Sequence, residues 1–382
     1  MLSNKNIIVL SILIVLSLLS VNLMVLGNIY ASTESIGNMT SEKSIPVYMI
    51  TTRGNLNMPQ GVQEFGYNDK YQFGDINQLK NECPDEIAIF VHGWHNDKLK
   101  AEERLDRVKM SLEKNNYIIP LIGLSWDSDK EWNPAKIIAK KNGPKLANFI
   151  IDYVNTCKEQ HNKDVNIRLI SHSLGARLLL STLDSLNTNP TWNNNNYKIT
   201  SVHLMGAAVD ADEVSKNSLI TNNDPVKDAY GNAIQEQVLR LYNLYNPEDN
   251  ILQFVYPKFD GIALGNSGRD QDIKEIDKVS TPPYFDINVR SEIPAISNAD
   301  AMEDKHFVFC GIIICDSINS KGWDMGLCLP FYFGTFLNKN CAVGIGDNHG
   351  GYIGFRAPTN KNLLEDDGAM NIVVENWRNP EN

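Results

Sequence analysis

The sequence predicts an α/β protein with a mostly parallel central sheet covered by helices on both faces. Short apolar runs rich in β-branched residues alternate with longer segments whose apolar residues recur at helical spacing. Each short run is apolar almost throughout, as in parallel strands whose two faces are both buried under helices. This repeated order of strand and helix is typical of α/β architecture.

Six strands and four helices are expected in order along the chain. The expected strands cover residues 47–52, 86–91, 118–126, 165–170, 199–205 and 238–245. The expected helices cover residues 99–114, 147–160, 174–186 and 371–378. Between about residues 257 and 345 the alternation gives way to Gly, Pro, Asn and Asp. Because a structureless loop of that length is implausible in a compact domain, we expect an insertion or cap there.

Length and charge restrict the class of partner. The chain has 382 residues, of which 42% are hydrophobic, so it can form a large core. Its 35 basic and 46 acidic residues give a formal net charge of −11. Because an acidic protein repels the phosphate backbone, we expect no nucleic-acid partner.

The N-terminal segment indicates export. Residues 7–26 are apolar and uncharged, and they follow Lys5 at the extreme N-terminus. Residues 1–31 are therefore expected to be either a signal peptide cleaved after about Ala31 or a retained membrane anchor. Residues 32–45 would be a linker, and residues 46–382 the folded domain. The expected location is extracellular, either secreted or anchored at the cell surface.

The cysteines fit an oxidising compartment, where disulfides persist. Four of the six lie within residues 310–341, which predicts a disulfide-containing insertion, and their spacing does not match a zinc ribbon. Cys83 precedes an expected strand, whereas Cys157 lies near the end of an expected helix. In a parallel α/β unit these two ends meet at the same edge of the sheet, opposite the carboxyl ends of the strands. A Cys83–Cys157 disulfide is therefore predicted. The six cysteines are Cys83, Cys157, Cys310, Cys315, Cys328 and Cys341.

A candidate nucleophile lies between an expected strand and an expected helix. Residues 171–176 read S-H-S-L-G-A, which places Ser173 at the tip of a tight turn. A serine held in this way is exposed at the carboxyl edge of the sheet, and the backbone N–H groups that begin the helix are available to an anion. A serine that only caps the helix is the alternative.

The S-H-S-L-G-A segment resembles the G-x-S-x-G nucleophile elbow of the α/β-hydrolase superfamily, especially its lipases and esterases. Ser171 stands where that motif has its first glycine. The order of elements over about residues 47–378 resembles the same superfamily. The resemblance implies an α/β-hydrolase fold in which Ser173 is the nucleophile.

A second segment is similar to the oxyanion-hole turn of this superfamily. Residues 92–95 read H-G-W-H and follow an expected strand, like the H-G turn after the third strand. The resemblance implies that Trp94 and Leu174 supply backbone N–H groups to the oxyanion hole. A metal site at His92, His95 and Asp97 is not expected, because the H-x-x-H pair does not lie on a helical face.

The base and acid of a triad follow the nucleophile in the superfamily's chain order. His349 lies in a glycine-rich loop before the last helix, as the superfamily's catalytic histidine does, and is preferred over His203 and His306. His203 falls inside an expected strand, where a buried structural role is expected. Asp249 follows the strand at 238–245 and is the preferred acid; Asp210, after the strand at 199–205, is the alternative.

These features together predict an exported serine hydrolase that cleaves carboxylic esters through an acyl-enzyme. The substrate would be a small-molecule or lipid ester, and no cofactor or metal is expected. Thioesterase, acyltransferase and amidase activities share this site geometry and stay open. An inactive hydrolase fold that serves as a surface binding module is the alternative from another class.

Overall fold

A sheet of seven parallel strands, with one antiparallel strand at its edge, forms the centre of the molecule. The computed structural model describes residues 44–54, 63–64, 73–217, 227–293, 349–357 and 360–380. The strand order is β2-β1-β4-β3-β5-β6-β7-β8, and only β2 runs antiparallel within this sheet of the described residues. The predicted parallel α/β architecture is confirmed.

The elements alternate along the chain as the sequence predicts. The strands are β1 (Val47–Thr51), β2 (Gln63–Glu64), β3 (Glu86–Val91), β4 (Leu121–Ser125), β5 (Asn166–His172), β6 (Ser201–Met205), β7 (Leu241–Tyr245), β8 (Tyr284–Asn288) and the antiparallel pair β9 (Phe355–Ala357) and β10 (Asn360–Asp366). The helices are α2 (Ile76–Glu82), α3 (Lys98–Lys114), α4 (Trp132–His161), α5 (Gly175–Asn187), α6 (Pro190–Asn194), α7 (Gly231–Gln237), α8 (Asn250–Phe254), α9 (Leu264–Ser267) and α13 (Met370–Arg378). Short 3-10 helices are η2 (Tyr256–Lys258), η3 (Glu275–Asp277) and η5 (His349–Ile353).

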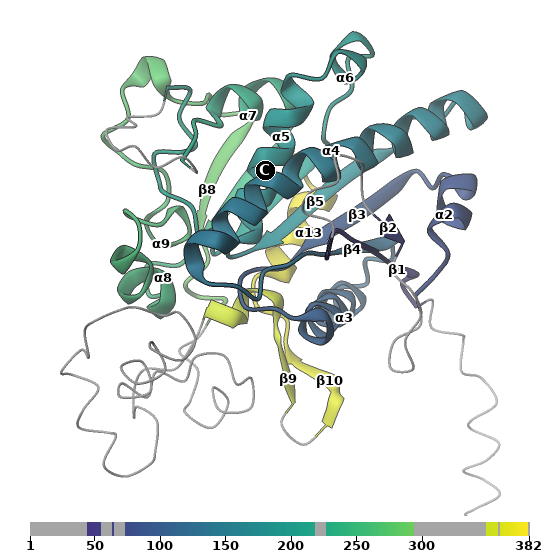
Figure 1. Ribbon diagram of the computed structural model, residues 1–382. Helices are drawn as coiled ribbons and strands as arrows, with labels where there is room; N and C mark the ends of the chain where they lie inside the picture. Colours follow the sequence, from purple (N-terminus) through teal and green to yellow (C-terminus); the bar gives the residue numbers. More distant parts are fainter. Residues whose placement is uncertain are drawn as a thin grey trace, which may run out of the picture. The chain divides into compact units, whose positions relative to one another are not determined.

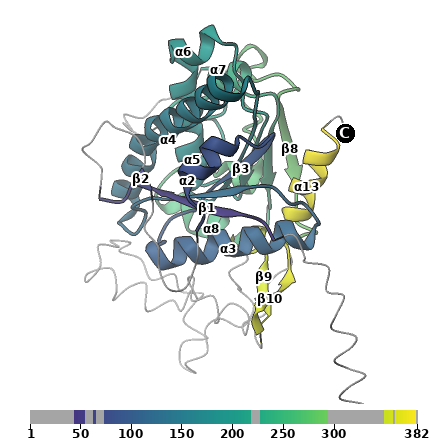
Figure 2. The same ribbon diagram turned by 90° about the vertical axis from the view of Figure 1, so that its right-hand side faces the viewer.

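Helices cover both faces of the sheet, as predicted. Successive side chains of a strand point to opposite faces, so Ile87 and Ile89 of β3 join one apolar cluster and Ala88 and Phe90 join the other. Helices α2, α4, α5, α6 and α7 contribute to the first cluster, and α3 and α13 to the second. Figures 1 and 2 show α4 and α3 on opposite sides of the sheet.

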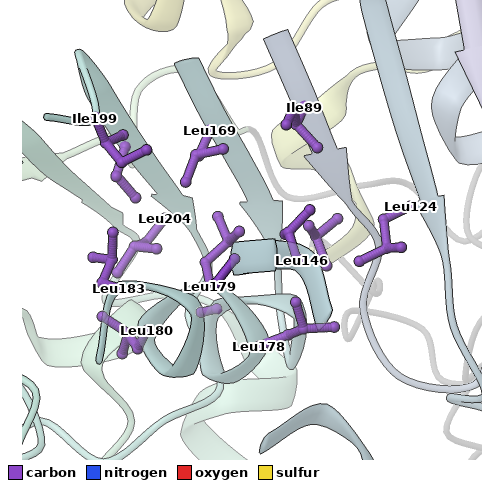
Figure 3. Packing of buried hydrophobic residues seen from close by; sticks show 14 of the residues in the cluster. Ile89, Leu124, Leu146, Leu169, Leu178, Leu179, Leu180, Leu183, Ile199 and Leu204 are labelled. Carbon is purple, nitrogen blue, oxygen red and sulfur yellow. The ribbon is translucent and has the colours of Figure 1, made fainter. Parts of the chain in front are cut away.

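Helix α5, which begins directly after Ser173, is the most deeply buried helix of the first layer. Its leucines pack toward the strands of the sheet (Figure 3), and α4 packs against α5. Leu178, Leu179, Leu180 and Leu183 are all fully buried. The burial of these leucines therefore holds the start of α5, and with it the turn at Ser173, in a fixed position.

Helix α4 begins 15 residues before the predicted start at residue 147, because the Gly143-Pro144 pair does not break it. Proline has no N–H, so the carbonyl four residues earlier, that of Lys140, loses its helical partner. The Ser181 hydroxyl of α5 donates to this carbonyl at 2.8 Å. A β-carbon on Gly143 would lie 2.5 Å from the Ser181 Oγ, so the glycine allows the close approach of the two helices.

Strand β8 was not predicted from the sequence. It lies within residues 257–345 and pairs in parallel with β7 at the edge of the sheet. Only Tyr284 of its five residues is buried, and Asp286 and Asn288 are exposed, so it lacks the continuous apolar run of a central strand. Residues 1–43 and the four cysteines of residues 310–341 lie outside the described residues, and so do His306 and most of the predicted insertion. Among the described residues, no helix is long and apolar enough to cross a membrane.

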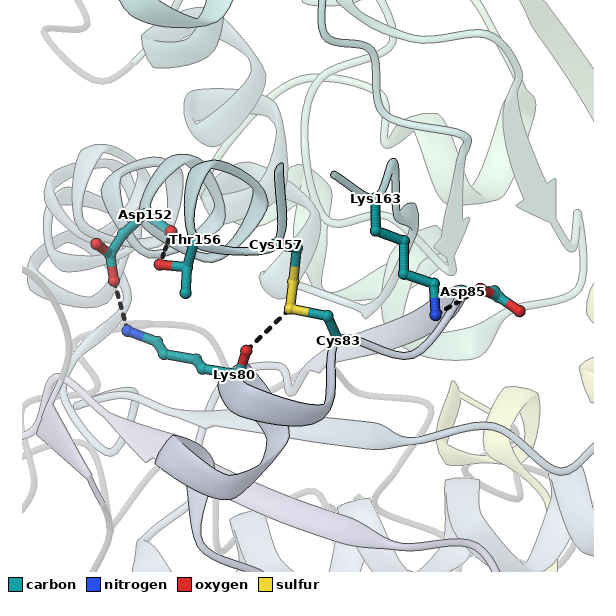
Figure 4. Close-up of a disulfide and its surroundings, with 7 residues drawn as sticks. All are labelled: Lys80, Cys83, Asp85, Asp152, Thr156, Cys157 and Lys163. Carbon is teal, nitrogen blue, oxygen red and sulfur yellow. Dashed lines mark hydrogen bonds and ion pairs between the residues drawn. A yellow bond between two sulfur atoms is a disulfide. The ribbon is translucent and has the colours of Figure 1, made fainter. Parts of the chain in front are cut away.

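The predicted Cys83–Cys157 disulfide is confirmed. It joins the end of α2 to the last turns of α4, with a Cα–Cα distance of 5.5 Å (Figure 4). The ion pair Lys163–Asp85 lies beside it at 2.7 Å. Cys83 lies shortly before the start of β3 at Glu86, so the bond lies at the edge of the sheet opposite the carboxyl ends of the strands.

Removing this disulfide should lower stability and leave the opposite edge of the sheet unchanged. The bond closes a loop with a sequence separation of 74, and disulfides of this kind typically contribute about 2–5 kcal/mol. We expect the double variant Cys83→Ser/Cys157→Ser to lose stability in that range when unfolded by urea. An equal midpoint and slope for the variant and the wild type would contradict a stabilising role.

Candidate active site

Ser173 lies in a strained turn at the carboxyl end of β5. Its φ is +56°, a left-handed conformation that serine rarely adopts, and its backbone N–H donates to the Met205 carbonyl at 3.0 Å. Two glycines make room for the turn. A β-carbon on Gly93 would lie 2.7 Å from the Ser173 Cβ, and one on Gly175 would lie 2.5 Å from the Val91 carbonyl oxygen. The geometry is that of a nucleophile elbow.

Ser171, in place of the elbow's first glycine, is accommodated inside the sheet. It is fully buried in β5, in register with Val91 of β3 and Leu204 of β6. Its hydroxyl makes no hydrogen bond to any part of the chain that the structure describes. The small side chain therefore fits at this position but contributes no polar contact there.

His349 and Asp249 form a direct buried contact. The His349 Nδ1 lies 2.7 Å from the Asp249 Oδ2, although the two residues are 100 positions apart. Because a carboxylate can only accept, Nδ1 carries the proton and Nε2 keeps its lone pair. The other carboxylate oxygen accepts from the Leu252 N–H at 3.0 Å, so Asp249 also caps α8.

Two further contacts fix the segment that carries His349. The His172 Nε2 donates to the His349 carbonyl at 2.7 Å, and the two imidazole rings lie 4.8 Å apart. Tyr352 lies fully buried beside Asp249, and burial, followed by the Asp249 charge, raises the pKa of its phenol well above its usual value. Tyr352 therefore stays neutral next to the carboxylate. Ser173 and His349 line the same pocket.

The competing triad candidates lie elsewhere. Asp210 accepts from the Tyr256 hydroxyl at 2.9 Å and from the Gly261 N–H at 3.0 Å, and it pairs with Lys227. His203 is fully buried in β6, and its ring is stacked on Tyr242 with 4.8 Å between centroids. Of the two aspartates, Asp249 is the one that the structure places against His349.

The loop after β3, residues 92–97, is held by its own side chains. The Gly93 carbonyl accepts from the His92 Nδ1 and from the Asn96 Nδ2, both at 3.0 Å. In a planar trans peptide the carbonyl and the next N–H point in opposite directions, so these two donors also fix the direction of the Trp94 N–H. The Asn96 Nδ2 also donates to the Trp94 carbonyl at 2.8 Å.

His92 is a neutral structural residue of this loop. Its Nε2 accepts from the Trp126 N–H at 3.2 Å, so both ring nitrogens are engaged by the backbone. Burial, followed by the charge of Arg53, lowers its pKa to about 3. His92 is therefore not a metal ligand, and among the described residues no group of histidine, cysteine and carboxylate side chains could hold a metal.

Leu174 precedes the first residue of α5. Within the part of the chain that the structure describes, its N–H makes no hydrogen bond. The first N–H groups of a helix lack intrahelical acceptors, and the helix dipole favours negative charge near them. An oxyanion beside Ser173 would find a donor here.

A mostly apolar pocket opens beside Ser173. The loop after β3, the start of α4, the end of β5 and the region of α8 and η2 all contribute to it. It is lined by Trp94, Arg104, Trp132, His172, Ser173, Ala208, Ile251, Leu252, Val255, Tyr256, Phe259, His349 and Gly350.

Several residues of the site were not predicted from the sequence. Asn96 and His172 act through hydrogen bonds to the backbone, and no spacing in the sequence indicates such bonds. Trp132 and Phe259 lie far apart in the chain, in segments without a recognisable motif. The adjacency of Asn96 to the H-G-W-H segment is the one sequence signal that could have pointed to a role.

The parallel sheet, the elbow at Ser173 and the H-G turn define an α/β-hydrolase fold. Residues 69–256 match the model of a family described as "Alpha/beta hydrolase of unknown function (DUF900)". A cutinase-like protein from Cryptococcus sp. is similar in structure, with a TM-score of 0.26 and 13% identity over 54% of this chain and 76% of that chain. A search of curated proteins finds no match.

The buried histidines should make stability depend on pH. Burial, followed by the charge of Arg168, lowers the pKa of His203 to about 3, whereas an unfolded histidine titrates near ~6.5. Between these values the unfolded chain binds a proton that the folded protein does not, so stability falls as the pH is lowered. From pH 7 to pH 5, His203 should account for a loss of about 2 kcal/mol.

The variant His203→Gln isolates this effect, because the other titrating groups are common to both proteins. Urea unfolding at pH 7 and pH 5 should show a smaller loss for the variant than for the wild type, by about 2 kcal/mol. The same pH dependence in both proteins would show that His203 is not held neutral by the fold.

Proposed function

We propose that this α/β-hydrolase is an exported serine hydrolase that cleaves carboxylic esters, with Ser173, His349 and Asp249 as its catalytic triad. The observation that carries the proposal is the 2.7 Å contact between His349 and Asp249, in a pocket that Ser173 also lines. This contact supports the proposal because a histidine and a carboxylate that would orient it lie beside the strained serine.

In the first step, the Ser173 hydroxyl attacks the ester carbonyl. The neutral Nε2 of His349 accepts the hydroxyl proton, and the Asp249 carboxylate stabilises the imidazolium that forms. His349 then donates this proton to the leaving alkoxide, and the acyl group stays on Ser173. Water, deprotonated by the same histidine, releases the acid and restores the serine.

The tetrahedral intermediates place negative charge on the former carbonyl oxygen. The backbone N–H groups of Trp94 and Leu174 would bind this oxygen, the first from the loop after β3 and the second from the start of α5. The bonds that Gly93 accepts support this role, because they hold the Gly93–Trp94 peptide in one orientation before substrate arrives.

Ester substrates are inferred from the likeness of the elbow to those of lipases and esterases. A small-molecule or lipid ester would satisfy the site, and the proposed steps use groups of the chain alone, so no cofactor or metal is expected. The Cys83–Cys157 disulfide supports an exported location, because such bonds persist in oxidising compartments.

A fluorophosphonate probe tests the nucleophile directly. We expect it to label the wild type, because an activated serine attacks phosphorus, and to leave Ser173→Ala unlabelled. The control Ser185→Ala should label like the wild type, because Ser185 lies in α5 but does not line the pocket. Asp249→Asn and His349→Ala should each slow the reaction by at least ~10³-fold.

Failure of the folded wild type to label would contradict the proposal and favour a non-catalytic binding module. Labelling that persists in Ser173→Ala would place the nucleophile elsewhere in the chain. Circular dichroism and urea unfolding of each variant would confirm that it is folded.

Asn96 tests the proposed oxyanion hole. The variant Asn96→Asp keeps the shape of the side chain but removes the donor to the Gly93 and Trp94 carbonyls. Losing one oxyanion donor typically costs ~10²–10³ in rate, so a misdirected Trp94 N–H should lower kcat by up to about 100-fold. KM should change little, because the effect falls on the transition state.

Affinity for a boronic acid inhibitor, which becomes tetrahedral on binding, should fall in parallel with kcat. Asn195→Asp is the matched control, because Asn195 is exposed after α6 and its amide also donates to a backbone carbonyl, that of Thr191. This variant should behave as the wild type. A kcat equal to that of the wild type in Asn96→Asp would show that the loop does not depend on Asn96.

A further inference from the structure

One side of the pocket beside Ser173 is an aromatic wall made of Trp94, Trp132, Tyr256 and Phe259. Trp94 belongs to the loop after β3, Trp132 is the first residue of α4, and Tyr256 and Phe259 lie in and just after η2. Three segments distant in the chain therefore meet to form this wall.

Trp132 is in contact with each of the other three rings. Its indole lies edge-on to Trp94, with 4.9 Å between centroids and an interplanar angle of 71°. It lies edge-on to Tyr256 at 5.7 Å and tilted against Phe259 at 5.8 Å. Aromatic pairs at these distances and angles attract one another, so the four rings support each other's orientation.

The polar atoms of the wall are all bound by the protein itself. The Trp132 Nε1 donates to the Asp260 Oδ2 at 2.6 Å, and the Trp94 Nε1 donates to the Lys130 carbonyl at 2.7 Å. The Tyr256 hydroxyl donates to the Asp210 carboxylate at 2.9 Å. What the wall presents to a ligand is therefore ring carbon.

Asp260 holds the Trp132 indole in place. Its second oxygen pairs with Lys136 at 2.6 Å, and the Lys136 and Asp260 side chains are only 3% and 7% exposed. Lys136 lies one turn along α4 from Trp132, so the pair fixes the indole relative to its own helix. A buried carboxylate bonded in this way strongly restricts the rotation of the ring.

The geometry points to a specificity site for a bulky apolar group, either an aromatic ring or a branched alkyl chain, carried by an uncharged ester. Trp132 is the specificity-determining residue, and Asp260 is a positioning residue that acts through it. Ala208, Ile251, Leu252 and Val255 extend the apolar lining. This inference rests on the proposed ester hydrolysis and adds the class of substrate.

Arg104 also lines the pocket and is the feature that would favour a different substrate. An ester carrying a second, ionised carboxylate could pair with its guanidinium. The apolar wall and Arg104 therefore make opposite predictions about substrate charge, and a small set of esters distinguishes them.

The test compares four esters by pH-stat titration: ethyl acetate, ethyl phenylacetate, benzyl acetate and the anionic monoethyl succinate. Ethyl phenylacetate carries its phenyl ring on the acyl side and benzyl acetate carries it on the alcohol side. The two sides of the ester are therefore probed separately. A pocket for one added apolar group typically gains about 10-fold or more in kcat/KM. We expect at least one phenyl ester to exceed ethyl acetate by that factor and monoethyl succinate to be the poorest substrate.

Trp132→Ala should abolish the preference for the phenyl ester while ethyl acetate is still hydrolysed. Asp260→Asn should raise KM for the phenyl ester more than KM for ethyl acetate, and Trp132→Phe should keep part of the preference. Phe254→Ala, on α8 but not in the lining, is the matched control. Rates within 3-fold for all four esters, or a preference for monoethyl succinate, would overturn the inference.

A binding measurement tests the apolar pocket independently of catalysis. Tryptophan fluorescence of the Ser173→Ala protein should change on adding benzyl acetate or ethyl phenylacetate and should stay constant with ethyl acetate at equal concentration. A Ser173→Ala/Trp132→Ala double variant should lose that response. Binding without hydrolysis by the wild type would contradict the proposed function alone, whereas hydrolysis without selective binding would contradict the pocket alone.

Discussion

The close approach of the loop after β3 to the start of α5 is the constraint on which the site depends. Ser173 adopts a left-handed backbone that costs a non-glycine residue on the order of 1–2 kcal/mol. That cost is offset because β5 pairs on both sides and the leucines of α5 are fully buried. Gly93 and Gly175 make the approach sterically possible. The core therefore supplies the energy that holds the serine in its strained turn beside the pocket.

The proposed nucleophile, Ser173, and the proposed base, His349, are linked through hydrogen bonds of neighbouring residues. His172 precedes Ser173 and donates to the carbonyl of His349, 177 positions away. The same His349 is held from its ring by Asp249, which also caps α8. A displacement of the turn at Ser173 would therefore displace His349, and unfolding of α8 would release Asp249 from its position. This arrangement explains why residues from three distant segments keep one geometry.

Most of the sheet could be predicted from the sequence because its central strands are buried on both faces and read as apolar runs. Edge strand β8 could not, since it is only partly covered and its pattern is mixed. The start of α4 could not either, because the partner that satisfies the Lys140 carbonyl is Ser181, which belongs to another helix. In the site, local motifs indicated Ser173, Trp94 and His349, whose catalytic roles stay predictions. The sequence favoured Asp249 but left Asp210 open, since both follow strands. The contact between Asp249 and His349 joins segments 100 positions apart and is seen only in the folded chain.

Asp210 and Asp260 show how buried carboxylates can shape a pocket without entering its chemistry. Each lies behind the aromatic wall and accepts a hydrogen bond from one of its rings, and each is balanced by a lysine, Lys227 or Lys136. The charges are thus neutralised on the protein side, while the pocket side is ring carbon. A wall of this kind lowers the local dielectric beside Ser173, and in a low dielectric a pair of oriented N–H groups stabilises an oxyanion more strongly than in water. The aromatic wall that would select an apolar substrate would therefore also strengthen the stabilisation of the oxyanion during hydrolysis of that substrate.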